Sequence, residues 1–151
     1  MLVLGLDPSL LNYGWALHES EQTGLPRCVE RGRFKAQGKN FPDVVSRYTY
    51  LREEVYNLVQ RCGTRRVGLE DPIFNAQQSS AKPARFIMSL EALKRARCDV
   101  VFFSPPQVKV LSREILGREK SWKMEKTEMV EAARKDTGGR GAWDHNEADA
   151  Y

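Results

Sequence analysis

The hydrophobic positions in the first quarter of the chain follow the pattern of β-strands. Residues 2–6 form an apolar run, residues 13–18 form a second, and residues 28–36 alternate loosely between apolar and polar side chains. A turn that contains glycine and proline, at residues 24–26, separates the last two. Because the connections are short, we expect the three strands to pair as an antiparallel meander.

The spacing of apolar positions then changes to the period of a helix. Over residues 43–61 apolar side chains recur at helical spacing, Asp43 is a suitable N-cap, and Gly63 is a suitable C-terminal stop. A short apolar strand over residues 66–69 follows and ends at Glu70. We therefore expect a helix that packs on the sheet, followed by a return strand.

Helical and strand patterns alternate through the rest of the chain. The expected elements are a loop over residues 71–82, a helix over 83–96 that Pro83 opens, a strand over 99–103, a helix over 104–116, a helix over 124–135 and the first turns of another over 144–151. Gly117 and the pair Gly138 and Gly139 are the expected stops of the two complete helices. A meander followed by strand–helix–strand crossovers predicts an α/β domain, with a mixed five-stranded sheet flanked by helices.

Length and composition limit the classes of protein. A chain of 151 residues builds one core, so residues 1–151 are expected to form a single domain. Apolar residues make up 41% of the chain, and no run approaches the roughly 20 that a membrane-spanning helix requires. The first residues lack a basic leader and the three cysteines are scattered singly, so we expect a cytoplasmic protein with no disulfide framework.

The net charge of +4 and the isoelectric point near 9.0 favour a polyanionic partner without specifying one. The distribution is more informative, because basic residues concentrate in the last third of the chain with Trp122 among them. They are Lys109, Arg113, Arg118, Lys120, Lys123, Lys126, Arg134, Lys135 and Arg140. This pattern fits either a surface that contacts nucleic acid or a solvated helical face whose glutamates offset part of the charge.

Three carboxylates stand at the ends of predicted elements. Asp7 follows the first strand at once, Glu70 ends the strand of the first crossover, and Asp149 lies near the start of the last expected helix. Such acids can converge, and hard oxygen ligands on rigid elements suit a pair of magnesium ions that clamp a phosphodiester. Taken singly, Asp7 could equally be a turn residue before Pro8, and Asp149 a first-turn acid that complements a helix dipole.

Four short motifs, in order and spread over nearly the whole chain, resemble those of RuvC-type Holliday-junction resolvases. Residues 5–9 (Gly-Leu-Asp-Pro-Ser), followed by residues 13–16 (Tyr-Gly-Trp-Ala), resemble the first-strand motif of that family. Residues 67–70 (Val-Gly-Leu-Glu) are similar to its second acidic motif. Residues 105–109 (Pro-Pro-Gln-Val-Lys) are similar to a helix start of the family, and residues 147–150 (Glu-Ala-Asp-Ala) to its closing motif.

The resemblance implies a ribonuclease H-like fold and the activity of a crossover-junction endodeoxyribonuclease, with magnesium-dependent paired cuts at four-way DNA junctions and 5′-phosphate products. It implies two Mg2+ ions per site, or Mn2+ in their place, with Asp7, Glu70 and Asp149 as ligands. Lys109 and, on a looser alignment, Lys126 would stabilise charge that develops on the scissile phosphate.

The resemblance also implies contacts with DNA and with a second copy of the chain. Phe74 falls where the family places an aromatic that stacks at the opened junction, although it could equally anchor its loop on the core. Arg113, Lys120 and Lys123 complete the expected DNA-binding set. We expect a homodimer that uses the helix over residues 83–96 and the loop after Glu70.

Two departures from the family pattern stand out near the end of the chain. Three positions before Asp149, where the family carries another acid or a histidine, this chain has Asn146. Helical spacing puts Asn146 and His145 on the face of Asp149, so we expect Asn146 as the fourth ligand and His145 as its substitute or supporting partner. The sequence stops two residues after Asp149, so the family's long closing helix is expected to be truncated here.

Three alternatives differ in substrate or in chemistry. The same metal chemistry could act on flaps, forks or other branched DNA. The neutral Asn146, whether natural or an inactivating change, also fits a junction-binding protein with weakened catalysis. Sugar-kinase and actin-like ATPases share a first strand that ends at an aspartate, but they need more than twice this length.

Overall fold

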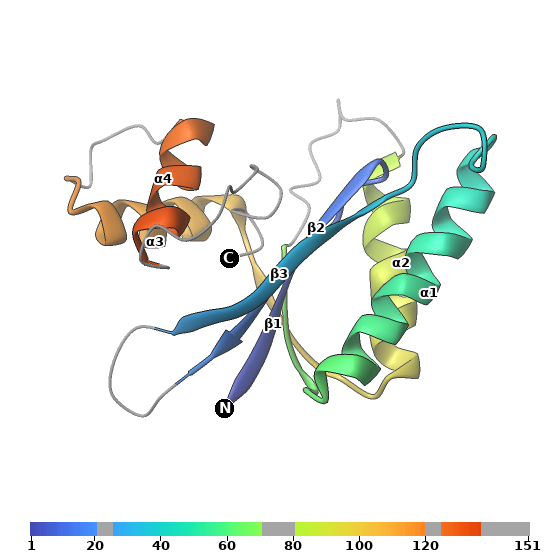
Figure 1. Ribbon diagram of the computed structural model, residues 1–151, viewed down its shortest axis with the longest axis horizontal. Coiled ribbons are helices and arrows are strands. Elements are labelled where there is room, and N and C mark those ends of the chain that lie inside the picture. Colours follow the sequence, from blue (N-terminus) through green and yellow to red (C-terminus); the bar gives the residue numbers. More distant parts are fainter. Residues whose placement is uncertain (21–25, 71–80, 120–124, 137–151) are drawn as a thin grey trace.

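A mixed five-stranded sheet forms the centre of the computed structural model, which describes residues 1–20, 26–70, 81–119 and 125–136 (Figure 1). The strand order is β3-β2-β1-β4-β5. The strands are β1 (Leu2–Asp7), β2 (Asn12–Glu19), β3 (Arg27–Lys35), β4 (Arg66–Glu70) and β5 (Asp99–Phe103). Strands β1, β2 and β3 form the predicted antiparallel meander, while β4 pairs parallel to β1 and β5 parallel to β4.

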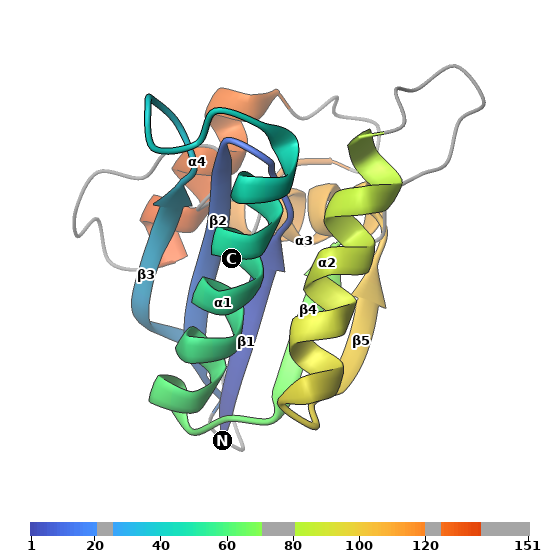
Figure 2. The same ribbon diagram turned by 90° about the vertical axis from the view of Figure 1, so that its right-hand side faces the viewer.

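Helices lie on both faces of this sheet. Helices α1 (Val44–Cys62) and α2 (Ala81–Arg95) cover one face, and α3 (Pro105–Leu116) and α4 (Lys126–Asp136) lie on the other (Figures 1 and 2). The predicted α/β architecture is therefore confirmed for the described residues.

The main core lies between the sheet and helices α1 and α2. Its fully buried side chains include Leu4, Leu6, Val67 and Leu69 from the strands and Leu51, Val55 and Leu93 from the helices. Successive side chains of a strand point to opposite faces, so the residues that alternate with Leu4 and Leu6 point toward the face of α3 and α4. This alternation decides where the polar ends of β1 and β4 lie.

Helix α1 begins and ends where its sequence predicts. The backbone N–H of Ser46 donates to Oδ1 of Asp43 at 2.7 Å, which satisfies one N–H group of the first turn. At the other end Gly63 adopts a left-handed conformation with φ of 63°, and its N–H donates to the carbonyl of Val59. A residue with a side chain would be strained at that φ, so glycine suits the position.

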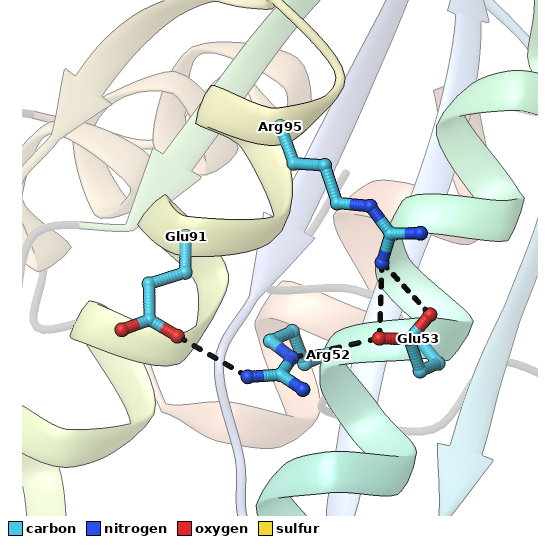
Figure 3. Close-up of polar contacts among 4 residues, drawn as sticks. All are labelled: Arg52, Glu53, Glu91 and Arg95. Carbon is cyan, nitrogen blue, oxygen red and sulfur yellow. Dashed lines mark hydrogen bonds and ion pairs between the residues drawn. The ribbon is translucent and has the colours of Figure 1, made fainter.

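Charged side chains connect the outer surfaces of α1 and α2 (Figure 3). Nη1 of Arg95 lies 3.0 Å from both carboxylate oxygens of Glu53. Arg52 lies 3.6 Å from a carboxylate oxygen of Glu53 and 3.6 Å from one of Glu91. The Arg95 guanidinium also stacks 3.9 Å from the centre of the Tyr56 ring.

Two helix starts differ from the sequence prediction. Helix α2 begins at Ala81 instead of Pro83, which then occupies the third helical position, where N–H groups have no intrahelical acceptor. Helix α4 begins at Lys126 instead of residue 124, because the N–H of Glu125 donates to the Glu128 carboxylate at 3.0 Å and its carbonyl accepts the first helical bonds.

Three predicted segments fall on positions that the structure does not describe. Residues 71–80 of the predicted loop, the glycine stop at 138–139 and the last expected helix all lie outside the described residues. Among the described helices, none is both long and apolar enough to span a bilayer.

Candidate active site

The carboxylates of Asp7 and Glu70 end two neighbouring parallel strands. Leu6 of β1 lies opposite Leu69 of β4, so Asp7 and Glu70 are each the next residue in register. Leu6 and Leu69 are buried in the main core, and their successors therefore point to the opposite face. Since neighbouring strands run about 4.8 Å apart, the structure brings these two predicted site residues together at one end of the sheet, where β1 and β4 finish.

A buried hydrogen bond fixes the strand on the other side of Asp7. Asp7 lies opposite Gly14 on β2, and the hydroxyl of the preceding Tyr13 lies 2.7 Å from Oγ of Ser89 on α2. Burial raises the pKa of the Tyr13 hydroxyl, the hydrogen bond with Ser89 lowers it, and the nearby Asp7 carboxylate raises it further. Tyr13 therefore stays protonated and holds β2 to α2 beside Asp7.

An aromatic ring flanks Glu70 on its other side. Phe103 ends β5 directly opposite Glu70, and its side chain is 44% exposed. A Cβ atom added to Gly68 would lie 3.0 Å from Cε2 of Phe103, so glycine makes room for this ring. Phe103 is not among the site residues that the sequence predicts, because its only local signal is an apolar residue at a strand end.

Helix α3 follows β5 at the same end of the sheet. Its start is defined by Ser104, whose backbone N–H donates to Oε1 of Gln107 at 2.8 Å and whose hydroxyl lies 2.9 Å from the same oxygen. Lys109 and Arg113 lie one turn apart on α3, on the side of the sheet toward which Asp7 and Glu70 point. Lys109 is exposed and Arg113 is half-buried.

Helix α4 packs beside α3 and against the edge of the sheet. Ala133 is buried with Val130 and Cys28 of β3, and Nζ of Lys135 donates to the carbonyl of Ile115 on α3 at 3.0 Å. Lys126 is the first residue of α4. The other predicted site residues lie outside the described residues: Phe74, Lys120, Lys123, His145, Asn146 and Asp149.

The described part of the chain contains two of the predicted metal ligands. Within it, no group of three or more histidine, cysteine, aspartate or glutamate side chains could hold a metal ion. Asp7 and Glu70 supply two carboxylates on one face, and carboxylate oxygens are the donors that Mg2+ and Mn2+ prefer. The donor type therefore fits the expected ions, while the other two expected ligands fall outside the described residues.

No family model and no curated protein sequence matches the chain. Solved structures do match it. The RuvC structure from Thermus thermophilus is 22% identical with a TM-score of 0.76, covering 99% of this chain and 89% of that chain. T. thermophilus RuvC in complex with Holliday junction substrate is 20% identical, with a TM-score of 0.75, covering 99% of this chain and 88% of that one.

A third similar structure is the yeast mitochondrial Holliday junction resolvase, which is 16% identical, with a TM-score of 0.61, covering 98% of this chain and 73% of that chain. At these identities the likeness is one of fold. The chain thus has the ribonuclease H-like fold of these resolvases, which confirms the fold that its motifs predict.

Proposed function

We propose that this chain is a RuvC-type resolvase, a DNA endonuclease that hydrolyses paired phosphodiesters at four-way junctions and leaves 5′-phosphate ends. One observation carries the proposal: Asp7 and Glu70, which occupy the positions of two acidic motifs of that family, are register neighbours on one face of the sheet. The fold around them is shared with the T. thermophilus RuvC structure over 99% of this chain.

The predicted site residues divide into metal ligands and cationic side chains that bind phosphate. Asp7, Glu70, Asn146 and Asp149 would hold two Mg2+ ions, with His145 as a substitute for Asn146. Such ions, when bound, lower the pKa of water and stabilise charge on a phosphate. The chain's own contribution would be geometric, because the parallel strands β1 and β4 end at Asp7 and Glu70, the residues that follow the register pair Leu6 and Leu69.

The cations act on the phosphate and on the arms of the DNA. Lys109 and Lys126 would neutralise charge that develops on the scissile phosphate, while Arg113, Lys120 and Lys123 would bind backbone phosphates further away. Phe74 would stack on a base at the opened crossover. A second copy of the chain would cut the symmetry-related strand.

The decisive experiment is cleavage of synthetic four-way, three-way, flapped and linear DNA with Mg2+, with Mn2+ and with chelator. Paired nicks in the four-way junction alone, only with a divalent ion, are the expected result. Equal cutting of flaps or forks would replace junction resolution by a broader branched-DNA nuclease. No cutting of any substrate would overturn the endonuclease proposal.

Replacing Asp7 tests the role of the carboxylate pair. Asp7→Asn keeps the shape of the side chain but removes its charge, and we expect at least about a hundredfold slower nicking with junction binding retained. Asp99→Asn is the matched control, because Asp99 is an exposed acid at the start of β5, at the opposite end of the sheet. Equal loss in both variants, or loss of folding in Asp7→Asn, would indicate a structural role.

Asn146 favours a second candidate, a protein that binds junctions and cuts them poorly. The family carries an acid or a histidine at this position, and an amide adds no negative charge to a metal site. Under the resolvase proposal Asn146→Asp keeps or raises the nicking rate. Tight, metal-independent junction binding without nicking, by both the wild type and Asn146→Asp, would select the binding protein.

A further inference from the structure

From Glu30 to its end, strand β3 carries its positive charges on one face only, while Arg27 at its start pairs with Glu19 of β2 at 2.8 Å. Phe34 packs on the rings of Tyr13 and Trp15, at centroid distances of 6.3 and 6.2 Å, and Glu30 pairs with Arg61 of α1 at 2.6 Å. Both residues therefore face α1, and the residues that alternate with them face the other way. These are Arg31, Arg33 and Lys35, which we call the basic row.

The register of the sheet places the basic row on the face that carries Asp7. Asp7 lies opposite Gly14, and Gly14 lies opposite Arg33. Arg33 is thus two strands from Asp7, about 10 Å away at the backbone, with only a glycine between them. The one irregularity of this pairing lies at Leu17 and His18, toward the other end, so the alternation from residue 30 to residue 35 is unbroken.

The direction of the strands brings the last residue of the basic row to the end of the sheet where Asp7 and Glu70 lie. Strands β1 and β3 both pair antiparallel to β2, so they run in the same direction and Lys35 ends β3 where Asp7 ends β1. The side chains of Arg33 and Lys35 are exposed, and Arg31, nearer α4, is half-buried. The one acid of β3, Glu30, lies on the opposite face.

The spacing of the basic row matches a nucleic-acid backbone. Alternate residues of a strand are about 6.8 Å apart, a length of helix axis over which one strand of DNA carries about two phosphates. The offset of about 10 Å from Asp7 to Arg33 runs across the β-strands, and one DNA strand carries about three phosphates over that length of helix axis. The basic row therefore lies within a few phosphates of the carboxylate pair.

We propose that the basic row binds the phosphate backbone of a duplex arm whose scissile phosphate lies at Asp7 and Glu70. The location of the scissile phosphate rests on the function proposed above, whereas the contact with duplex backbone does not require a junction. The basic row gives no sequence preference, since it reaches phosphates and not base edges. It extends the DNA-binding surface beyond the stretch from Lys109 to Lys126, to the far side of the carboxylates.

The test compares two variants that each lose two positive charges. Arg33→Gln/Lys35→Gln removes the exposed members of the basic row. Arg65→Gln/Lys94→Gln is the control, because these exposed residues precede β4 and end α2, at the opposite end of the sheet. Equilibrium binding to a four-way junction and to a linear duplex is measured in chelator, over a range of salt from about 50 to about 200 mM.

We expect the slope of log affinity against log salt to become shallower by about 1.8 in the Arg33→Gln/Lys35→Gln variant, since each lost phosphate contact removes about 0.9. Its deficit relative to wild type then shrinks about tenfold over that salt range. The control keeps the wild-type slope, and Arg33→Lys/Lys35→Arg restores it. Thermal unfolding of each variant checks that the sheet edge is intact.

Each outcome separates the basic row from the proposed function. An unchanged slope in Arg33→Gln/Lys35→Gln, or the same change in the control, overturns the proposal that the basic row binds DNA, even if the wild type resolves junctions. A shallower slope on linear duplex supports the basic row even if the wild type shows no junction preference. A wild type that binds neither DNA overturns both proposals.

Discussion

At the scale of single residues, the imidazole of His18 is a buried titratable group on the face of the sheet that carries Asp7. His18 lies between Val3 of β1 and Cys28 of β3 and is 6% exposed. Burial lowers the pKa of the imidazole from 6.5 to about 4. The folded state therefore favours the neutral ring, whereas the unfolded chain takes up a proton at higher pH.

This difference predicts that acid destabilises the fold through His18. The contribution of His18 to the free energy of unfolding is fully present above pH 6.5. It is lost as the pH falls from 6.5 toward 4, and the loss totals roughly 3 kcal/mol. His18→Gln removes the titration, so its free energy of unfolding should depend less steeply on pH in that window. Urea unfolding at several pH values measures both curves, and parallel curves would contradict the prediction.

At the scale of elements, apolar packing and not surface charge is expected to hold α1 to α2. The Arg95 and Glu53 side chains are 54% and 41% exposed, and exposed pairs contribute only about 0–1 kcal/mol. Stacking of Arg95 on Tyr56 adds about 0.5–1 kcal/mol. Leu93 of α2, by contrast, is fully buried in the main core.

The prediction is a difference between two alanine substitutions in α2. Leu93→Ala should lower the free energy of unfolding by about 2–5 kcal/mol, because it leaves a cavity. Arg95→Ala should lower it by less than about 2 kcal/mol, and the cycle with Glu53→Gln should give a coupling below about 1 kcal/mol. Denaturant unfolding measures both, and equal losses would show that the surface network matters more than its exposure suggests.

Elements with strong local signals are those that the sequence predicts well. Helix α1 has an N-cap at Asp43 and a stop at Gly63, and α3 has its start at Ser104, so their boundaries follow from neighbouring residues. The start of α4 depends on one side chain, Glu128, that bonds back to Glu125. This bond is one half of the capping box, a recognised helix start signal, but the residue before the helix is glutamate and not the usual serine or threonine.

The candidate site could be predicted only as far as it depends on strand ends. Asp7 and Glu70 each follow an apolar strand, which is visible in the sequence. Phe103 reaches the same region through the pairing of β5 with β4, and Arg33 through the pairing of β3 with β2, so both positions depend on strand register. The alternating basic residues of β3 are a sequence signal for the face they share, although not for its distance from Asp7.

At the scale of the whole molecule, one chain has one Asp7–Glu70 pair at one end of its sheet. Resolving a four-way junction takes two cuts on strands related by a two-fold axis, so a two-fold dimer would place one site on each strand. The proposed function therefore predicts that the two cuts are made by different copies of the chain.

A mixed dimer tests this division of labour. Wild type and Asp7→Asn chains with different affinity tags are combined, and successive purification on both tags isolates the dimer with one intact site. On a plasmid that extrudes a cruciform, wild type should give linear product from two cuts. The mixed dimer should stop at nicked circles, because the Asp7→Asn substitution removes the charge at residue 7 of its second site. The Asp7→Asn homodimer sets the background. Linear product from the mixed dimer at the wild-type rate would mean that one site makes both cuts, and failure of two chains to assemble on the junction would remove the dimer from the mechanism.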